Sequence, residues 1–385
     1  MKKSTFIILC LEGAVLSFNV AAAAALIPSI AEEFALSQFT VGKIIWLYMI
    51  PYGAAAFLYG PLIRLFDARK VELYCIFFFS LSNFLAGLST GINALYAGRL
   101  LMGLSGASVI PLGLILIARH TAKETRGRYI GIFFGATFVA SLLGLFLSGL
   151  INWRMIFLIP ALSGLALWVI MYFYLPSFKD GLGDFRFGYL EAIKNAKVAR
   201  IFVFIFLISL FYHAIQQWLG VYFSTQLNLN QFLVSVLLTL TSLSGIFGEV
   251  WGGCLADSLG RVKVVNLGIL LMLFCVLALL AKLPLGFIGL AMVVWGLGWS
   301  FNHVGLSTML TELPEQFLNE AASLNSGVRF ISGGLGAALS GLIICKSFSF
   351  GFFVFGLGLL ALLLSSRFIV IKDKGGKDEP GIIKR

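Results

Sequence analysis

Four charged side chains stand inside long apolar segments of this chain: Glu12, Arg99, Glu249 and Arg329. A charge within hydrocarbon costs at least about 2.5–3.5 kcal/mol, so each of the four needs a partner or a function. Glu249 and Arg329 lie at similar depths in their segments, and we predict that they form an ion pair, either permanent or broken during a working cycle. Arg99 either binds an anionic group or satisfies backbone carbonyls of its neighbours.

Glu12 and Asn19 are seven residues apart and therefore share one face of a helix. At a rise of about 1.5 Å per residue, Glu12 lies roughly 10 Å inside its segment, at a different depth from Arg99. A direct pair of these two residues is therefore not expected. Two interpretations remain for Glu12: a cavity-facing site for a proton or another cation, or a buried, hydrogen-bonded carboxylate. Glu12, Glu249 and Arg329 are the three residues predicted to take part in ion binding.

Polar and aromatic side chains also recur on single faces of two apolar segments. Between 201 and 223, Ser209, His213 and Gln216 follow helical spacing. Lipid would penalise such a stripe, so it either lines a cavity or binds neighbouring helices. Between 284 and 311, aromatic rings stand beside a few polar groups, which suits an organic solute of mixed character, or else aromatic core packing. The residues predicted to line a cavity are Asn19, Arg99, His213, Gln216, Gln217, Trp295, Trp299, Asn302 and His303.

The elements that must position these residues are membrane-spanning helices. The chain has 385 residues, of which 59% are hydrophobic and 12% charged, and its mean hydropathy is +0.98. Soluble domains contain roughly 45–50% apolar and about 25% charged residues, so a soluble globular enzyme is excluded. Twelve apolar runs are long enough to cross a bilayer, and we expect an all-α polytopic membrane protein. They cover residues 5–29, 40–62, 72–90, 94–118, 129–151, 155–176, 201–223, 232–255, 264–281, 284–311, 321–344 and 348–371, to within a few residues.

The basic residues predict the orientation of the chain. With the N-terminus inside, 22 of the 28 lysines and arginines fall in cytoplasmic segments. Lys43, Arg154, Lys282 and Lys346 fall outside, and Arg99 and Arg329 lie within spans. This asymmetry follows the positive-inside rule, and it accounts for the net charge of +11 without a nucleic-acid partner. We therefore expect a multi-pass protein of the inner membrane with both termini in the cytoplasm.

The longest connection, residues 177–200, divides the twelve spans into six and six. Leu190, Ile193 and Ala196 recur there at helical spacing among charged residues. This pattern predicts an amphipathic helix at the cytoplasmic surface of the membrane.

An internal repeat supports the same division. At an offset of 193 residues, Gly60–Arg64 aligns with Gly253–Asp257, and both stretches follow the second span of a six-span half. A duplicated six-helix unit is typical of transporters, with a solute site near the bilayer midplane between the halves. The expected organisation is a six-helix bundle over 1–176, a linker over 177–200, a second six-helix bundle over 201–372 and a cytoplasmic tail over 373–385.

The sequence lacks the motifs needed for nucleotide binding, nucleophilic catalysis or metal binding. The Gly-rich stretch at 333–336 lies in an apolar segment with no strand before it, so helix packing explains it better than phosphate binding. No Walker motif and no nucleophile arrangement occurs, so we expect no cofactor, no metal and no enzymatic activity. The cysteines form no CxxC pair and are interpreted as reduced and structural: Cys10, Cys75, Cys254, Cys275 and Cys345.

Three motifs resemble those of the major facilitator superfamily. The loop Gly253-Cys-Leu-Ala-Asp257-Ser-Leu-Gly260-Arg261-Val-Lys263 is similar to the superfamily's signature loop. Leu95-Tyr-Ala-Gly-Arg99-Leu-Leu-Met-Gly103 resembles its fourth-helix motif, and Trp153-Arg154 its sixth-helix start. The resemblance covers residues 1–372 and implies two bundles of six helices that rock about a central solute site. It also implies a gating loop made by Gly253, Asp257, Gly260 and Arg261, in which Asp257 acts as a latch at the start of the eleventh span.

Departures from the family pattern bear on the kind of transport. The first copy of the loop has Arg64 and Asp67 where the family has Asp and Gly. Ala136 and Asn19 stand where many drug:proton antiporters carry Pro and Asp. We expect a monomeric secondary transporter that exports a small organic solute, with H⁺ or, less favoured, Na⁺ as the coupling ion. The alternatives are proton- or sodium-driven uptake of an organic anion or sugar, and a non-transporting receptor or assembly protein. Beyond solute and ion, the bilayer is the only partner expected.

Overall fold

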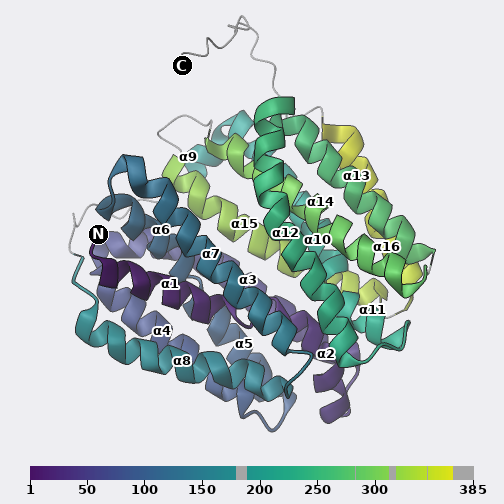
Figure 1. Ribbon diagram of the computed structural model, residues 1–385, viewed down its shortest axis with the longest axis horizontal. Coiled ribbons are helices and arrows are strands. Elements are labelled where there is room, and N and C mark those ends of the chain that lie inside the picture. The colour runs from purple at the N-terminus through teal and green to yellow at the C-terminus, as the bar shows by residue number, and fades with distance from the viewer. Residues whose placement is uncertain (179–188, 282, 312–317, 345, 367–385) are drawn as a thin grey trace, which may run out of the picture.

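A computed structural model describes residues 1–178, 189–281, 283–311, 318–344 and 346–366. All regular structure in these residues is α-helical (Figure 1). Three of the predicted spans consist of two helices in line with a short break between them: α1 (Lys3–Ser17) and α2 (Ala22–Glu33), α5 (Ile92–Gly106) and α6 (Val109–His120), and α10 (Ala196–Gln216) and α11 (Leu219–Thr225). The remaining spans are α3 (Gln38–Leu65), α4 (Ala68–Gly87), α7 (Lys123–Leu147), α8 (Trp153–Tyr174), α12 (Gln231–Leu259), α13 (Arg261–Leu280), α14 (Leu285–Thr311), α15 (Leu318–Ile344) and α16 (Phe348–Ser365).

The predicted all-α fold with twelve spans is confirmed. Eleven of the spans are both long and apolar enough to cross a membrane. The twelfth, α4, is more polar because it carries Glu72, Asn83 and several serines, but its 20 residues still extend over roughly 30 Å. Its polar side chains are buried against other helices.

Short polar side chains determine where many of these helices begin. Asp67 accepts a hydrogen bond from the N–H of Arg69 at the start of α4, and Asn195 accepts from Lys197 and Val198 at the start of α10. Such caps satisfy backbone donors that have no partner within the helix. Equivalent caps are made by Ser37 for α3, Asn152 for α8, Asn230 for α12 and Ser347 for α16.

The linker between the two halves is only partly helical. A six-residue helix, α9 (Tyr189–Lys194), is followed directly by the cap of α10, so Ala196 belongs to the next span and not to the predicted surface helix. The Tyr189 hydroxyl donates to the Phe57 carbonyl at the end of α3. Part of the predicted linker, residues 179–188, and the predicted tail over 373–385 lie outside the described residues.

Buried apolar side chains form two large clusters. One consists mainly of residues from 6 to 178, the other mainly of residues from 198 to 362. A few side chains, such as Ala25, Leu145 and Trp218, join the cluster of the other half. Each half therefore has its own core, and the halves meet through a limited set of helices.

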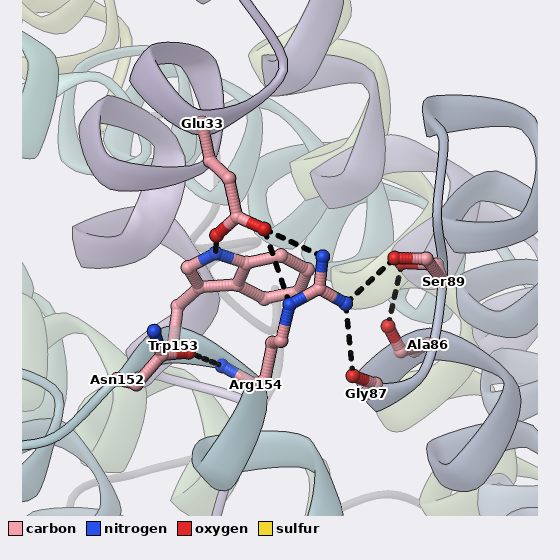
Figure 2. A network of polar contacts seen from close by, with 7 residues as sticks. All are labelled: Glu33, Ala86, Gly87, Ser89, Asn152, Trp153 and Arg154. Carbon is pink, nitrogen blue, oxygen red and sulfur yellow. Dashed lines mark hydrogen bonds and ion pairs between the residues drawn. The ribbon is translucent and has the colours of Figure 1, made fainter.

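At the end of the bundle opposite the N-terminus, here called the opposite face, one arginine forms hydrogen bonds to several helix ends. Arg154 at the start of α8 donates to the Glu33 carboxylate over 2.5 and 3.1 Å (Figure 2). The same guanidinium donates to the carbonyls of Gly87 and Ser89, and Trp153 donates its indole N–H to Glu33. One charged group thus connects the end of α2, the α4–α5 loop and the start of α8.

The two halves also contact each other at the opposite face. Gln231 at the start of α12 donates to the carbonyls of Ala25 and Ser148, and Ser235 donates to the Leu145 carbonyl. Elsewhere α3 and α15 pack closely along their lengths, as at Gly53, where an added Cβ would lie 2.7 Å from a carbonyl oxygen of α15. These contacts close the opposite face between the halves.

Candidate functional site

A cavity of about 180 Å³ lies between α7 of the first half and three helices of the second half. Its walls combine aromatic rings, hydroxyls and a single carboxylate, the mixture that suits an organic solute with apolar and polar parts. The lining residues are Phe138, Ser141 and Leu142 of α7, Tyr212 of α10, Thr241, Ser242, Gly245, Ile246 and Glu249 of α12, and Gly296, Trp299 and Ser300 of α14.

An aromatic stack forms one wall of this cavity. The Tyr212 ring lies between two tryptophans, with centroids 4.0 Å from Trp299 and 5.2 Å from Trp295, and both pairs are nearly parallel. The His213 ring meets Trp299 edge-on at 5.4 Å. Gln216 fixes Trp295 by accepting its indole N–H over 2.7 Å. The structure thus unites four of the predicted residues, while Gln217 caps the end of α10 next to them.

The charged residues near the cavity are arranged differently from the prediction. Glu249 Oε1 lies 2.8 Å from His303 Nδ1, an ion pair whenever His303 is protonated. Glu249 and Arg329 form no direct ion pair among the described residues in this conformation, and the predicted pair stays a prediction; each of the two side chains contacts His303 instead. Arg329 donates to Asn325 Oδ1 over 2.8 Å and to the His303 carbonyl over 3.5 Å, and its guanidinium lies 5.7 Å from the Trp299 ring.

Of the nine residues predicted to line the cavity, Trp299 is the one found among the described lining residues. His213, Gln216, Gln217, Trp295 and His303 lie beside or behind the aromatic wall, and the remaining three point elsewhere. Arg99 is almost fully buried, donates to the Ile44 carbonyl and lies over the Tyr48 ring, so it satisfies backbone within the first half. Asn19 donates to Asn83 of α4 over 2.5 Å. Asn302 donates to the Gly298 carbonyl of its own helix and faces α13. Helical spacing placed these residues on polar faces, but those faces meet neighbouring helices and not the cavity.

The third ion-binding candidate, Glu12, lies away from the cavity within the first half. It is 1% exposed and interacts with Glu72, a buried glutamate that the sequence analysis did not single out. The signal that could have identified Glu72 is its place in the first turn of an apolar run. Tyr212 was also missed, although it lies four residues before Gln216 on the same polar face of α10.

The predicted gating loop joins α12 to α13. Gly260 has φ of +92°, a conformation that side chains other than glycine rarely adopt, which explains a glycine at this turn. Gly253 packs near Val304 of α14. Asp257 is exposed and accepts no hydrogen bond from the described residues, whereas Arg261 begins α13. The residues directly before α15, 312–317, fall outside the described part of the chain, so the predicted contact of Asp257 with the start of the eleventh span stays a prediction.

The corresponding loop of the first half is bonded differently. Asp67 accepts hydrogen bonds from the Ser177 hydroxyl and the Phe178 N–H just after α8. Burial alone would raise the pKa of Asp67, but these hydrogen bonds and the one from Arg69 lower it below its usual value. Arg69 also donates to the Tyr172 carbonyl. The loop between α3 and α4 is therefore fastened to the end of α8.

The cavity wall formed by α7 continues toward the N-terminal end of the bundle as a row of small residues. Gly131 and Gly135 share the helix face of Phe138 and Leu142, and an added Cβ at either glycine would meet no heavy atom within 4 Å. Because the opposite face is closed, the open space beside these glycines lies on the side of the cavity where α1 begins.

Comparison with known proteins agrees with this architecture. A sequence model of the Major Facilitator Superfamily matches residues 9–341. The chain is 24% identical over 354 residues to the inner membrane transport protein YdhP of Escherichia coli (strain K12), covering 89% of this chain and 90% of that protein. It is 30% identical over 148 residues to the MFS-type efflux transporter pyiT of Pyricularia grisea, covering 36% of this chain and 24% of the length of that relative.

A solved structure, that of the nucleoside transporter NupG, has a TM-score of 0.77 to this chain at 14% identity, covering 95% of this chain and 100% of that one. At this identity the likeness describes the fold alone. The family match extends over both halves and includes the cavity, and the twelve spans form the two six-span halves that the resemblance implied. The chain belongs to the major facilitator superfamily of multi-pass membrane transporters.

Proposed function

We propose that this transporter exports a small organic solute in exchange for protons, by exposing the cavity alternately to the two sides of the membrane. The observation on which the proposal rests is the aromatic stack beside Glu249 in a cavity formed by both halves. The similarity to a protein named an efflux transporter supports the outward direction.

The cavity favours a flat, partly apolar solute that carries a positive charge or a hydrogen-bond donor. The stack of Tyr212 and Trp299 offers an aromatic face, and stacking contributes about 0.5–1.5 kcal/mol beyond the buried area. Glu249 is the carboxylate of the cavity wall and can accept a hydrogen bond from the solute. Solute and proton would compete for this carboxylate, which is the property that an exchanger requires.

Orientation follows from the basic residues at helix ends. Arg69, Arg119, Arg128 and Lys263 lie at the end of the bundle where the chain begins, and we assign this end to the cytoplasm. The space beside Gly131 and Gly135 then opens inward. In this orientation the Asp257 loop is the latch that closes when the cavity turns outward, and Asp257→Asn is expected to slow transport while solute affinity changes by a few-fold at most.

Uptake of an organic anion is the weaker candidate. The sequence supported it through Arg99 and Arg329, which could bind an anion. In the structure Arg99 donates to the Ile44 carbonyl within the first half, and Arg329 contacts Trp299 and His303 and does not line the cavity. No separate observation favours a receptor that binds without transport.

The test uses proteoliposomes loaded with a mixed pool of metabolites and drugs, with and without an imposed pH gradient, and mass spectrometry of what remains. Loss of one compound only with the gradient supports the proposal. Equal loss without a gradient would contradict proton coupling, and retention of every compound would favour a non-transporting role.

Once a solute is known, substitutions of Trp299 and Glu249 test whether the cavity is its binding site. Trp299→Ala is expected to raise KM about tenfold, the equivalent of about 1.4 kcal/mol, and Trp251→Ala is the matched control because Trp251 is 55% exposed on the outside of α12. Glu249→Gln is expected to abolish the response to the pH gradient, with Glu191→Gln on α9 as its control. An unchanged gradient response in Glu249→Gln would exclude this carboxylate as the coupling group.

A further inference from the structure

Two glutamate side chains lie next to each other inside the first half with no cation beside them. Glu12 of α1 and Glu72 of α4 are 1% and 0% exposed. Both oxygens of Glu12 and Oε1 of Glu72 accept no hydrogen bond from the described residues. Only Glu72 Oε2 has a donor, the hydroxyl of Ser108, at 3.3 Å. The two carboxyl groups are close enough to interact directly.

Two negative charges cannot persist in this environment. Removing each carboxylate from water is costly, and mutual repulsion in a medium of low dielectric constant adds to that cost. One proton removes a charge and also supplies a donor, because a neutral carboxyl group can donate to the carboxylate beside it. The Ser108 hydroxyl stabilises the charged form of Glu72, so Glu12 is the side chain that carries the proton.

Among the described residues, the side chains that interact with the two glutamates are neutral. Cys75 of α4 donates from its sulfur to the Tyr59 hydroxyl of α3 over 3.4 Å, and Tyr59 donates to the Leu104 carbonyl. These two neutral groups are the other titratable side chains that interact with the glutamates. No Lys, Arg or His within the described parts of α1 and α3 to α8 forms an ion pair with Glu12 or Glu72.

We propose that Glu12 and Glu72 form a binding site for a single proton, held between their carboxyl groups within the first half. The site joins α1 to α4, and the hydrogen bond from Asn19, in the break after α1, to Asn83 joins the same span to α4. Release of the proton would leave two adjacent charges in the core and force α1 and α4 apart. The site is separate from the cavity and does not depend on the identity of the solute.

The experiment is infrared spectroscopy of the purified full-length protein at neutral pH, which reads the carbonyl stretch of protonated carboxylic acids. The wild type is expected to show such a band, and the band is expected to disappear in the double variant Glu12→Gln/Glu72→Gln, which removes both carboxyl groups of the site. The control, Glu32→Gln at the exposed end of α2, is expected to retain the band.

Other outcomes overturn the proposal. A band that persists in the double variant would show that the protonated carboxyl group lies elsewhere in the protein. If a variant fails to fold, the wild type alone decides, because absence of any protonated-carboxyl band at neutral pH is incompatible with the site. Disappearance of the wild-type band on adding NaCl at constant pH would identify a sodium site instead. None of these readouts involves transport, so they stand apart from a failure of the proposed export.

Discussion

Two glycines of one helix provide a sharp test of the packing between α7 and the break in the first span. At Gly144, an added Cβ would lie 1.7 Å from the carbonyl oxygen of Phe18 and 2.7 Å from its carbonyl carbon. At Gly135, nine residues earlier on α7, it would meet nothing within 4 Å. The same substitution, Gly to Ala, is therefore expected to have opposite effects at the two positions.

The size of the difference follows from two opposing terms. Alanine favours a helix over glycine by about 1 kcal/mol, and this gain is available at both sites. At Gly144 the obstacle is backbone, so the Phe18 carbonyl must withdraw by roughly 1.3 Å to reach the 3.0 Å that real Cβ contacts respect. Overpacking of this kind costs about 1–3 kcal/mol or more. Because the helix gain cancels between the two variants, we expect Gly144→Ala to be the less stable by the overpacking cost, about 1–3 kcal/mol or more.

The assay is thermal unfolding of both variants in the same detergent, followed by tryptophan fluorescence and by the amount of monodisperse protein after heating. Gly135→Ala is expected to match or exceed the wild type, and Gly144→Ala to unfold several degrees earlier. Equal melting temperatures for the two variants would refute the close approach of α7 to Phe18.

Three further predictions concern the closing of the cavity, the stability of the opposite face and the pH dependence of unfolding. Gly135→Leu is expected to unfold at the same temperature as the wild type but to lose most transport in proteoliposomes, because the open space beside Gly135 must close in the other conformation. Normal transport by this variant would show that α7 does not approach the second half at Gly135. Arg154→Ala is expected to cost about 1–2 kcal/mol in detergent unfolding, since it removes charge-assisted hydrogen bonds that are partly exposed, whereas Arg128→Ala, on an exposed residue, should cost almost nothing. Asp67→Asn is expected to lower the melting temperature at neutral pH. Because the pKa of Asp67 is lowered in the folded state, its contribution is present above about pH 4, the ordinary Asp pKa, and is lost as the pH falls further, so the difference from the wild type should shrink in acid; a difference independent of pH would contradict this role.

The sequence was sufficient for the spans and the family because hydropathy reports which segments enter hydrocarbon. Backbone groups there must be satisfied within a helix, so each apolar run predicts one span. The polar partners were not predictable in the same way, because they depend on how each helix is rotated and on which neighbour it meets. Glu249 contacts the ring of His303 and Arg329 contacts its carbonyl, and helical spacing alone did not indicate this third residue.

The burial of Glu72 is a second feature that the sequence did not predict. At the start of an apolar run it reads as a residue at the membrane surface, but the packing of α1 and the α5–α6 break buries it completely. The breaks themselves were not predicted either. The break at Phe18–Ala21 contains Asn19 but no proline or glycine, so the sequence offers no strong helix breaker there, and the carbonyl of Phe18 lies against Gly144.

Polar groups are used differently in the two halves, and this asymmetry has a consequence for transport. In the first half, Arg99 and Asn19 are bonded to other groups of that half, which makes it a rigid unit. In the second half, Tyr212, Glu249 and Trp299 face the cavity, while α7 contributes mainly small or apolar side chains to its wall. Substitutions among the polar groups of the first half should therefore change the rate of transport with little effect on KM, and substitutions in the aromatic stack should change KM first. A first-half variant such as Asn83→Ala that raised KM as much as Trp299→Ala would show that both halves bind the solute directly.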